Sequence, residues 1–189
     1  MTLTILWLVL LCGWTVSEVL ILMVTRTRRG SGDIRDRGSL LVLWPVIMAS
    51  IWIGSWLGAI SPHTIFGGAY WVWSASFVIF AAGVAVRWTA IATLGRSFSA
   101  NVAIHATQTV HKTGLFRFVR HPSYSGMVLI FIAIGAHTRN WAALAILVVP
   151  TTAALLYRIH VEEEALVGAF GEEYVEYRRG TKRLVPGVY

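Results

Sequence analysis

Long runs of apolar residues, separated by short polar segments, dominate the chain. Three runs occupy residues 3–24, 40–60 and 70–94, and each is long enough to supply the roughly 20 helical residues that cross the hydrocarbon core of a bilayer. Two further apolar segments, 122–136 and 141–159, flank a polar turn at 137–140. The first of these is only about 22 Å long at 1.5 Å per residue. We expect the two to form a helical hairpin, with a kink at Pro150 in the second helix.

Composition and charge indicate an integral membrane protein. Of the 189 residues, 56% are hydrophobic and only 13% are charged, and the mean hydropathy is +0.65. The net charge of +7 does not indicate nucleic-acid binding, because the basic residues form short clusters between apolar runs. The arginine-rich loop at 25–38 is typical of a cytoplasmic loop, whereas the turn at 61–68 has no Lys or Arg.

These patterns predict an all-α integral membrane protein with about five transmembrane helices, including the C-terminal hairpin. The N-terminus is expected outside and the C-terminus in the cytoplasm. The first span lacks a basic leading segment and a small-residue cleavage site, so it is interpreted as a retained span rather than a signal peptide.

Two charged residues fall inside the predicted spans. Glu18 is a functional candidate by default, although it lies close to the next loop and could instead reach the interface or pair with an arginine. Arg87 lies about two turns before the cytoplasmic end of the third span. Its side chain either extends to the interface or turns inward towards a site.

The sequence offers little for metal or redox chemistry. Cys12 is the single cysteine, which excludes a disulfide or a thiolate metal cluster within one chain. His105 and His111 have no acidic or cysteine partner at ligand spacing, so no metal site is predicted.

A cationic turn stands directly before the predicted hairpin. Arg120 and His121 lie at the mouth of an apolar helix, where an unpaired charge is costly and must find water, an anion or a carboxylate. Pro122 suits the first turn of that helix, because it has no amide proton and a fixed φ. Glutamates 162–164 follow the hairpin, so the basic and acidic segments should meet at one face of the membrane. Successive helical residues point about 100° apart, so the three glutamates cannot all face one site.

Four motifs occur in a fixed order. They are R-H-P-x-Y-x-G at 120–126, E-E at 162–163, F-G-x-x-Y-x-x-Y at 170–177 and R-L-x-P at 183–186. With Gly114-Leu115-Phe116, this order resembles the C-terminal half of the isoprenylcysteine carboxyl methyltransferase family, which is related to the phospholipid methyltransferases. The resemblance covers residues 94–186, and residues 1–93 match only as generic spans. The chain departs from the family pattern at Leu115, where proline is common, and at 180–182, just before Arg183.

The resemblance implies a division into a three-span membrane region over residues 1–94 and a catalytic region over 95–189. The catalytic region would hold a cofactor-binding motif, the hairpin and a cytoplasmic C-terminal helix. S-adenosylmethionine would bind in a pocket facing the cytoplasm, and a lipophilic substrate would enter from the bilayer through a gap between helices. The cofactor-binding residues implied are Leu115, His121, Pro122, Tyr124, Gly126, Glu162 and Tyr174. The catalytic residues implied are Arg120, Glu163 and Arg183.

The chemistry of methyl transfer leaves the acceptor open. A carboxylate is already ionised near neutral pH and needs only an arginine fork, from Arg120 or Arg183, and the exclusion of water. An amine must lose a proton, for which Glu162, Glu163 or His121 would serve as the base. We therefore expect a carboxyl methyltransferase acting on an isoprenoid or prenylcysteine-like molecule. The alternatives are a phospholipid (phosphatidylethanolamine) N-methyltransferase, an NADPH-dependent membrane lipid reductase, and a transporter or scaffold without enzymatic activity.

Overall fold

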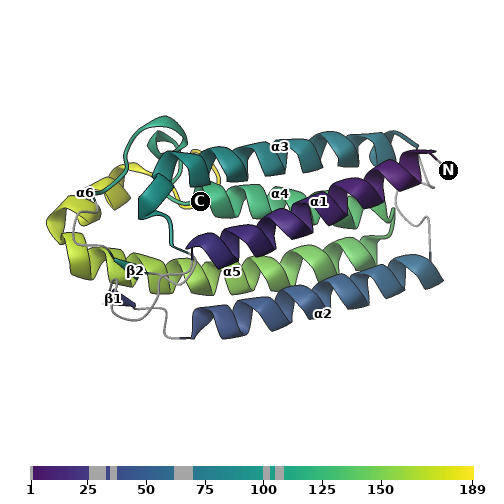
Figure 1. The fold of residues 1–189 in the computed structure, drawn as a ribbon, viewed down its shortest axis with the longest axis horizontal. Helices are drawn as coiled ribbons and strands as arrows, with labels where there is room; N and C mark the ends of the chain where they lie inside the picture. The colour runs from purple at the N-terminus through teal and green to yellow at the C-terminus, as the bar shows by residue number, and fades with distance from the viewer. Residues whose placement is uncertain (1, 26–32, 35–37, 62–69, 100–102, 105–108) are drawn as a thin grey trace.

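Five long helices and one short helix account for nearly all of the regular structure that the computed structural model describes (Figure 1). The model describes all residues except 1, 26–32, 35–37, 62–69, 100–102 and 105–108. The helices are α1 (Thr2–Thr25), α2 (Ser39–Ile60), α3 (Tyr70–Leu94), α4 (Pro122–His137), α5 (Trp141–Phe170) and α6 (Glu172–Gly180). Residues 62–68 of the polar turn, most of the arginine-rich loop and His105 lie outside the described residues.

Short elements connect the helices at the end where α6 lies (Figure 1). Two 3-10 turns, η2 (Gly95–Ser97) and η3 (Gly114–Arg117), follow α3 and precede α4. Strand β1 (Asp33–Ile34) pairs antiparallel with β2 (Ala103–Ile104), with Asp33 opposite Ile104. This pairing joins the loop after α1 to the connector after α3.

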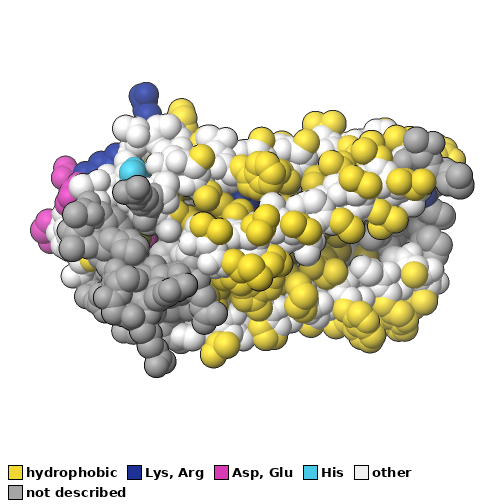
Figure 2. Space-filling model, viewed as in Figure 1, with side chains coloured by type: hydrophobic (Ala, Val, Ile, Leu, Met, Phe, Trp, Pro, Cys, Tyr) yellow, Lys and Arg dark blue, Asp and Glu magenta, His cyan; other side chains and the backbone are white. Residues whose placement is uncertain are grey.

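Four of the helices, α1, α2, α3 and α5, are long and apolar enough to cross a membrane, and α4 is a shorter apolar helix of 16 residues. Figure 2 shows hydrophobic side chains along the whole visible face of the bundle, whereas the acidic side chains in view gather at the end with α6. The prediction of an all-helical integral membrane protein is confirmed. The count of five spans, the orientation of the termini and the division at residue 94 stay predictions.

Helices from the two halves of the chain pack against each other, α3 on α4 and α2 on α5. Glycines allow the closest approaches. A Cβ added to Gly126 would lie 2.6 Å from the carbonyl oxygen of Gly83, and one added to Gly83 would lie 2.8 Å from the carbonyl oxygen of Gly126. Gly54 of α2 faces Leu147 of α5 in the same way, at 2.9 Å. The first half of the chain therefore fixes the position of the hairpin.

The second hairpin helix is longer than the hydrophobic pattern predicts. We expected it to end near residue 159, but α5 continues to Phe170 and passes Pro150 without a break. The extension is possible because its charged residues have partners. Glu163 is only 2% exposed and forms ion pairs with Arg120 and Arg183, so burying its carboxylate in a continued helix is not prohibitive.

Helix α1 crosses the front of the bundle in Figure 1 and is attached through a few specific contacts. The ring of Trp7 stacks on His137, with centroids 3.8 Å apart. Both oxygens of Glu18 pair with Arg87, which donates from Nε and Nη2 at 2.5 Å each. Arg87 is 6% exposed, so it turns inward and does not extend to the interface.

Candidate active site

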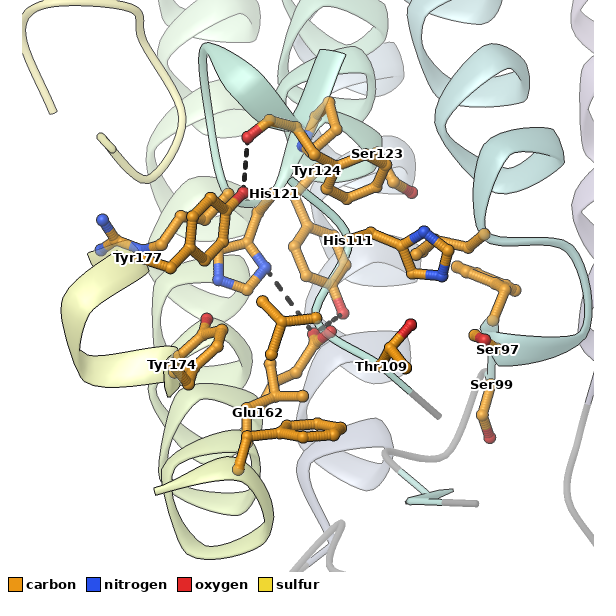
Figure 3. Close-up of a pocket in the computed structure, with 18 residues that line it drawn as sticks. Ser97, Ser99, Thr109, His111, His121, Ser123, Tyr124, Glu162, Tyr174 and Tyr177 are labelled. Atoms are coloured by element: carbon orange, nitrogen blue, oxygen red, sulfur yellow. Dashed lines mark hydrogen bonds and ion pairs between the residues drawn. The ribbon is translucent and has the colours of Figure 1, made fainter. Parts of the chain in front are cut away.

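A pocket of about 90 Å3 lies at the end of the bundle where α4 begins, α5 ends and α6 crosses (Figure 3). His121, Ser123 and Tyr124 reach it from one side, Glu162 from α5, and Tyr174 and Tyr177 from α6, while Ser97, Ser99, Thr109 and His111 face it from the connector. Apolar groups complete the wall, among them Phe116, Leu166 and Phe170. The pocket therefore combines aromatic surface with a carboxylate and several hydroxyl groups.

Six of the ten predicted site residues line this pocket: Arg120, His121, Pro122, Tyr124, Glu162 and Tyr174. Four do not. Gly126 contacts the backbone of α3, and Leu115 lies in η3, where its carbonyl oxygen accepts from the amides of Phe118 and Val119. The remaining two, Glu163 and Arg183, form a cluster with Arg120.

Glu163 is the centre of a buried charge cluster. Its Oε1 accepts a hydrogen bond from Nε of Arg120 at 2.8 Å, and its Oε2 accepts from Nε and Nη2 of Arg183 at 3.1 and 3.0 Å. Nε2 of His121 lies 3.4 Å from Oε1. The hydrogen bonds that Arg183 donates to Glu163 raise the pKa of the Arg183 guanidinium. The basic segment at 120–122 and the acidic segment at 162–163 thus meet, as the sequence predicts.

Arg120 also ties the C-terminal segment to the start of α4. Its Nη1 donates to the backbone carbonyl oxygens of Arg178, at 3.0 Å, and Thr181. Its backbone amide donates to the carbonyl oxygen of Lys182 at 2.8 Å, within a parallel bridge between Val119 and Lys182. Arg120 therefore uses much of its hydrogen-bonding capacity on the protein itself and positions α6 over the pocket.

A second hydrogen-bond network, centred on Glu162, faces the pocket. The hydroxyl of Tyr124 donates to Oε2 of Glu162 at 2.8 Å and accepts from Nε of Arg158 at 2.9 Å. Nη1 of Arg158 donates to the hydroxyl of Ser39 at 2.7 Å. Glu164 instead pairs with His160, at 3.2 Å. Of the three consecutive glutamates, Glu162 is the one that lines the pocket.

Arg158 lines the apolar cavity although it lies outside the four sequence motifs. Its side chain is buried, with 3% of the residue exposed. The signal that identifies it is its position one helical turn before Glu162, because residues four apart lie on the same face of a helix. A basic residue at that spacing from the pocket carboxylate should have been counted as a candidate.

The two tyrosines of α6 differ in their hydrogen bonding. The hydroxyl of Tyr177 donates to the carbonyl oxygen of Phe116 at 2.5 Å, and burial raises the pKa of Tyr177 to about 12. The hydroxyl of Tyr174 is buried and has no hydrogen-bond partner among the described residues. Burial, together with the charges of Glu163 and Glu162, raises the pKa of Tyr174 above its ordinary value. Buried polar groups are nearly always paired, so among the described residues the hydroxyl of Tyr174 is an unusual group on the wall of the pocket.

A larger cavity of about 320 Å3 lies between α1 and α2, with α4 and α5 behind it. Its walls are mostly Leu, Ile, Met, Val and Trp side chains, and its ionisable groups are Glu18, Arg87, Tyr124 and Arg158. Tyr124, Phe98 and Ser99 line both this cavity and the polar pocket. The two spaces therefore adjoin at the start of α4.

Comparisons with known proteins agree on one family. A sequence model of the isoprenylcysteine carboxyl methyltransferase (ICMT) family matches residues 75–168. The fold is similar to that of the eukaryotic intramembrane Ras methyltransferase ICMT, with a TM-score of 0.62 and 22% identity over 77% of this chain and 52% of that chain.

The curated relatives are methyltransferases of two kinds. Protein-S-isoprenylcysteine O-methyltransferase B of Arabidopsis thaliana is 31% identical over 122 residues, which is 63% of this chain and 61% of the relative. Methanethiol S-methyltransferase of a Pseudomonas strain is 38% identical over 72 residues, which is 38% of this chain and 26% of the relative. The chain thus spans about three fifths of the length of the plant relative and about a quarter of the bacterial one.

The fold and the site define an integral membrane protein with a polar pocket next to an apolar intramembrane cavity. The chain belongs to the isoprenylcysteine carboxyl methyltransferase family. The prediction of the family from the four ordered motifs is confirmed. Among the described residues there is no group of three or more His, Cys, Asp or Glu side chains arranged to hold a metal ion.

Proposed function

We propose that the protein is an S-adenosylmethionine-dependent methyltransferase that methylates the carboxylate of a lipophilic, isoprenoid or prenylcysteine-like molecule. The observation that carries this proposal is the junction of two unlike cavities at Tyr124, Phe98 and Ser99. A polar pocket suits a charged methyl donor, and an apolar cavity open between membrane helices suits the tail of a lipid. Group transfer requires the two ligands to meet, and here their spaces adjoin.

The residues of the polar pocket fit S-adenosylmethionine. Tyr174 offers a hydroxyl donor that has no partner in the described part of the chain, and this donor matches a ribose oxygen or the carboxylate of the methionyl group. The carboxylate of Glu162 matches the ribose hydroxyls or the ammonium group, and Tyr124 holds it in place at 2.8 Å. Phe116 and Phe170 supply flat apolar surface for the adenine ring. These assignments rest on the chemistry of the residues that line the pocket.

The acceptor carboxylate needs a cation at the junction, and we assign this role to Arg158. It lines the apolar cavity and donates to the hydroxyl of Tyr124, a residue common to both spaces. Arg120 and Arg183 are bound to Glu163, and Arg183 does not line either space. We propose that Arg120, Arg183 and Glu163 hold α6 over the donor pocket, so that their effect on catalysis is through positioning.

For this reaction the protein needs mainly to orient the donor and the acceptor and to exclude water from the site. Tyr174 and Glu162 would hold the donor, which would supply an activated methyl group to a carboxylate oxygen and would keep the electrons of the broken carbon–sulfur bond on its sulfur. No proton moves, because the carboxylate is already ionised. Arg158 orients the oxygen, Tyr124 stands beside it where the two spaces adjoin, and the apolar wall excludes water. Holding both reactants in one geometry contributes most of the rate enhancement of such a reaction.

A second acceptor class follows from the relatives. The methanethiol S-methyltransferases match this chain at 35–38% identity, although over fewer residues than the plant proteins. A thiol, like a phospholipid amine, must lose a proton before attack, and Glu162 or His121 is the nearest pocket group that could accept it. The apolar cavity favours the lipophilic carboxylate, because a small thiol would leave most of it unfilled.

The test is methyl transfer by the purified protein in lipid nanodiscs. S-adenosylmethionine carrying a labelled methyl group would be offered with a prenylcysteine, a fatty acid, phosphatidylethanolamine and a small thiol. Base-labile label in the prenylcysteine or fatty acid is expected, because a methyl ester is base-labile. Transfer only to the amine or the thiol would replace the carboxylate proposal. The absence of saturable S-adenosylhomocysteine binding by calorimetry would refute the methyltransferase assignment as a whole.

We also propose that the site faces the cytoplasm. The arginine-rich segment follows Thr25 and precedes Ser39 in the sequence, and these ends of α1 and α2 lie at the end of the bundle that holds the pocket (Figure 1). Arginine excess marks cytoplasmic loops. A cysteine would be introduced in place of Glu172, in α6, and spheroplasts would be treated with a membrane-impermeant thiol reagent. We expect no labelling of this cysteine, and labelling would show that the site faces the outside.

A further inference from the structure

We propose that Trp14 sets the length of the hydrocarbon tail that the cavity between α1 and α2 accepts. The inference rests on the proposed function, because it assigns this cavity to the tail of the acceptor lipid. It adds a specificity-determining residue far from the donor pocket.

The lining residues show where the cavity ends. Starting from the junction at Tyr124, the deepest lining residues are Trp14 on α1, Ile51 on α2 and Phe131 on α4. Tyr124 and Phe131 are seven residues apart on one helix, which corresponds to about 10 Å at 1.5 Å per residue. On α2 the lining runs from Leu40 to Ile51, which corresponds to about 16 Å. A tail whose reactive group lies at Tyr124 therefore has a short, defined space.

The ring of Trp14 lines the end of that space farthest from Tyr124 and packs against the core. It meets Phe131 edge to face, with centroids 6.1 Å apart and an interplanar angle of 87°. It meets Phe80 in the same way, at 6.3 Å and 84°. Trp14 is 9% exposed and Phe131 is 1% exposed. A longer tail would have to displace an aromatic cluster, which is a steep barrier in a closely packed interior.

A polar network inside the membrane region fixes the orientation of the ring. Nε1 of Trp14 donates to Oε1 of Glu18 at 3.0 Å, and both oxygens of Glu18 are held by Arg87 at 2.5 Å. Nη1 of Arg87 donates in turn to the hydroxyl of Ser123 at 2.7 Å. Ser123 lines the donor pocket at the start of α4. Charged residues are costly at this depth. Here they form hydrogen bonds that connect Trp14, at the end of the cavity, to Ser123, at the start of α4.

The proposal predicts that binding affinity stops rising beyond a certain tail length, which we call the break point. For full-length protein in nanodiscs, unbranched carboxylic acids of increasing chain length would compete with a fluorescent lipid acid. Affinity should rise with each carbon until the tail reaches Trp14 and then stop rising. In Trp14→Ala the break point should move to longer chains. An acid two carbons longer than the wild-type break point should then bind more tightly than the acid at the break point, and the ratio of the two affinities should rise on the order of tenfold over the wild-type ratio, as burial of about two more methylenes implies.

Two further variants make the test independent of how Trp14→Ala folds. Ile51→Trp fills the same end of the cavity from α2 and should move the break point to shorter chains. Trp7→Ala is the matched control, because Trp7 is an equally buried indole on α1 that packs against Phe77, Phe80 and His137 and does not line the cavity. Its break point should equal that of the wild type.

The outcomes separate the two proposals. A break point that does not move in Ile51→Trp, or that moves as far in Trp7→Ala as in Trp14→Ala, would overturn the role of Trp14. Methyl transfer would be measured on the same acids. A shifted break point in binding without transfer to any acid would refute the proposed function and leave the length limit standing, whereas transfer with the same chain-length optimum in every variant would refute the length limit alone.

Discussion

Glu163 accepts a hydrogen bond from Nε of Arg120 at 2.8 Å, although the two residues are 43 positions apart in the sequence. Both side chains are almost fully buried. The bond joins α5 to the turn before α4, and through Arg120 it reaches the backbone of α6. This relationship makes the polar pocket a product of three elements that no local sequence signal connects. It also explains why a run of glutamates can continue a membrane helix.

Breaking the ion pair between Glu163 and Arg120 should weaken the attachment of α6 to the rest of the protein. In Glu163→Gln, Arg120 keeps its charge but loses its buried counterion, which typically costs about 3–5 kcal/mol of stability. We expect a lower thermal unfolding midpoint in nanodiscs and a turnover reduced roughly 100-fold, as small displacements of binding residues produce. Glu164→Gln is the control, because Glu164 is exposed and pairs with the exposed His160 on its own helix. Equal turnover in both variants would contradict a positioning role for Glu163.

Tyr174→Phe should weaken donor binding without weakening the fold. Its hydroxyl lacks a partner among the described residues, so removing it sacrifices no hydrogen bond within the part of the protein described here. We expect an unchanged or higher unfolding midpoint. The affinity for S-adenosylhomocysteine should fall about fivefold to tenfold, in keeping with about 1 kcal/mol for one hydrogen bond.

The matched variant Tyr177→Phe should behave in the opposite way. It loses the bond to the carbonyl oxygen of Phe116, so its midpoint should fall. Calorimetry and thermal unfolding on both variants provide the comparison. The pKa of Tyr174 is raised by burial, so its hydroxyl stays protonated, and its contribution to binding should be constant between about pH 7 and pH 9, below the ordinary tyrosine pKa of about 10. A contribution that declines across this range would show that the hydroxyl ionises.

Gly126→Ala should act first on stability. The added Cβ would fall 2.6 Å from the carbonyl oxygen of Gly83 and 2.8 Å from Cβ of Arg87, so α3 and α4 would have to separate. Overpacking of this kind costs about 1–3 kcal/mol or more. Gly13→Ala, with nothing within 4 Å of the added Cβ, should leave the midpoint unchanged. If Gly126→Ala instead kept wild-type stability and lost S-adenosylhomocysteine affinity, Gly126 would be a cofactor-binding residue, as its motif implies.

Arg158→Gln should separate acceptor binding from donor binding. We expect kcat/KM for a lipophilic acid to fall roughly 10-fold to 100-fold, which is the range for a hydrogen bond to a charged group, while S-adenosylhomocysteine affinity changes little. Arg158→Lys should restore part of the loss, because it returns the charge but not the planar fork. Arg179→Gln, at an exposed position of α6, is the control. Loss of donor affinity with unchanged acceptor KM would place Arg158 in the donor pocket instead.

The sequence predicted what depends on hydrophobic length and on local motif chemistry. The bounds of α1, α2, α3 and α4 follow from the apolar runs, and the meeting of Arg120 with the glutamates follows from the hairpin. The end of α5 could not be predicted, because helix continuation through residues 162–164 depends on Arg120 and Arg183, which lie elsewhere in the chain.

Other features depend on helix packing rather than on sequence pattern. The sequence left two positions open for Arg87, and only the depth of Glu18 on a neighbouring helix decides that Arg87 turns inward. Gly126 belongs to a recognised motif, but its close contact with Gly83 requires the arrangement of α3 and α4. The apolar cavity likewise has no linear signature, because its walls come from different helices.

The most direct test of the two-cavity account is an experimental structure of the protein with S-adenosylhomocysteine and a prenylcysteine bound together. The account predicts the nucleoside beside Tyr174 and Glu162, the tail between α1 and α2, and the carboxylate at Tyr124 and Arg158, facing the sulfur. A nucleoside bound elsewhere, or a lipid held only on the outer surface of the bundle with α1 and α2 closed over an empty space, would contradict it.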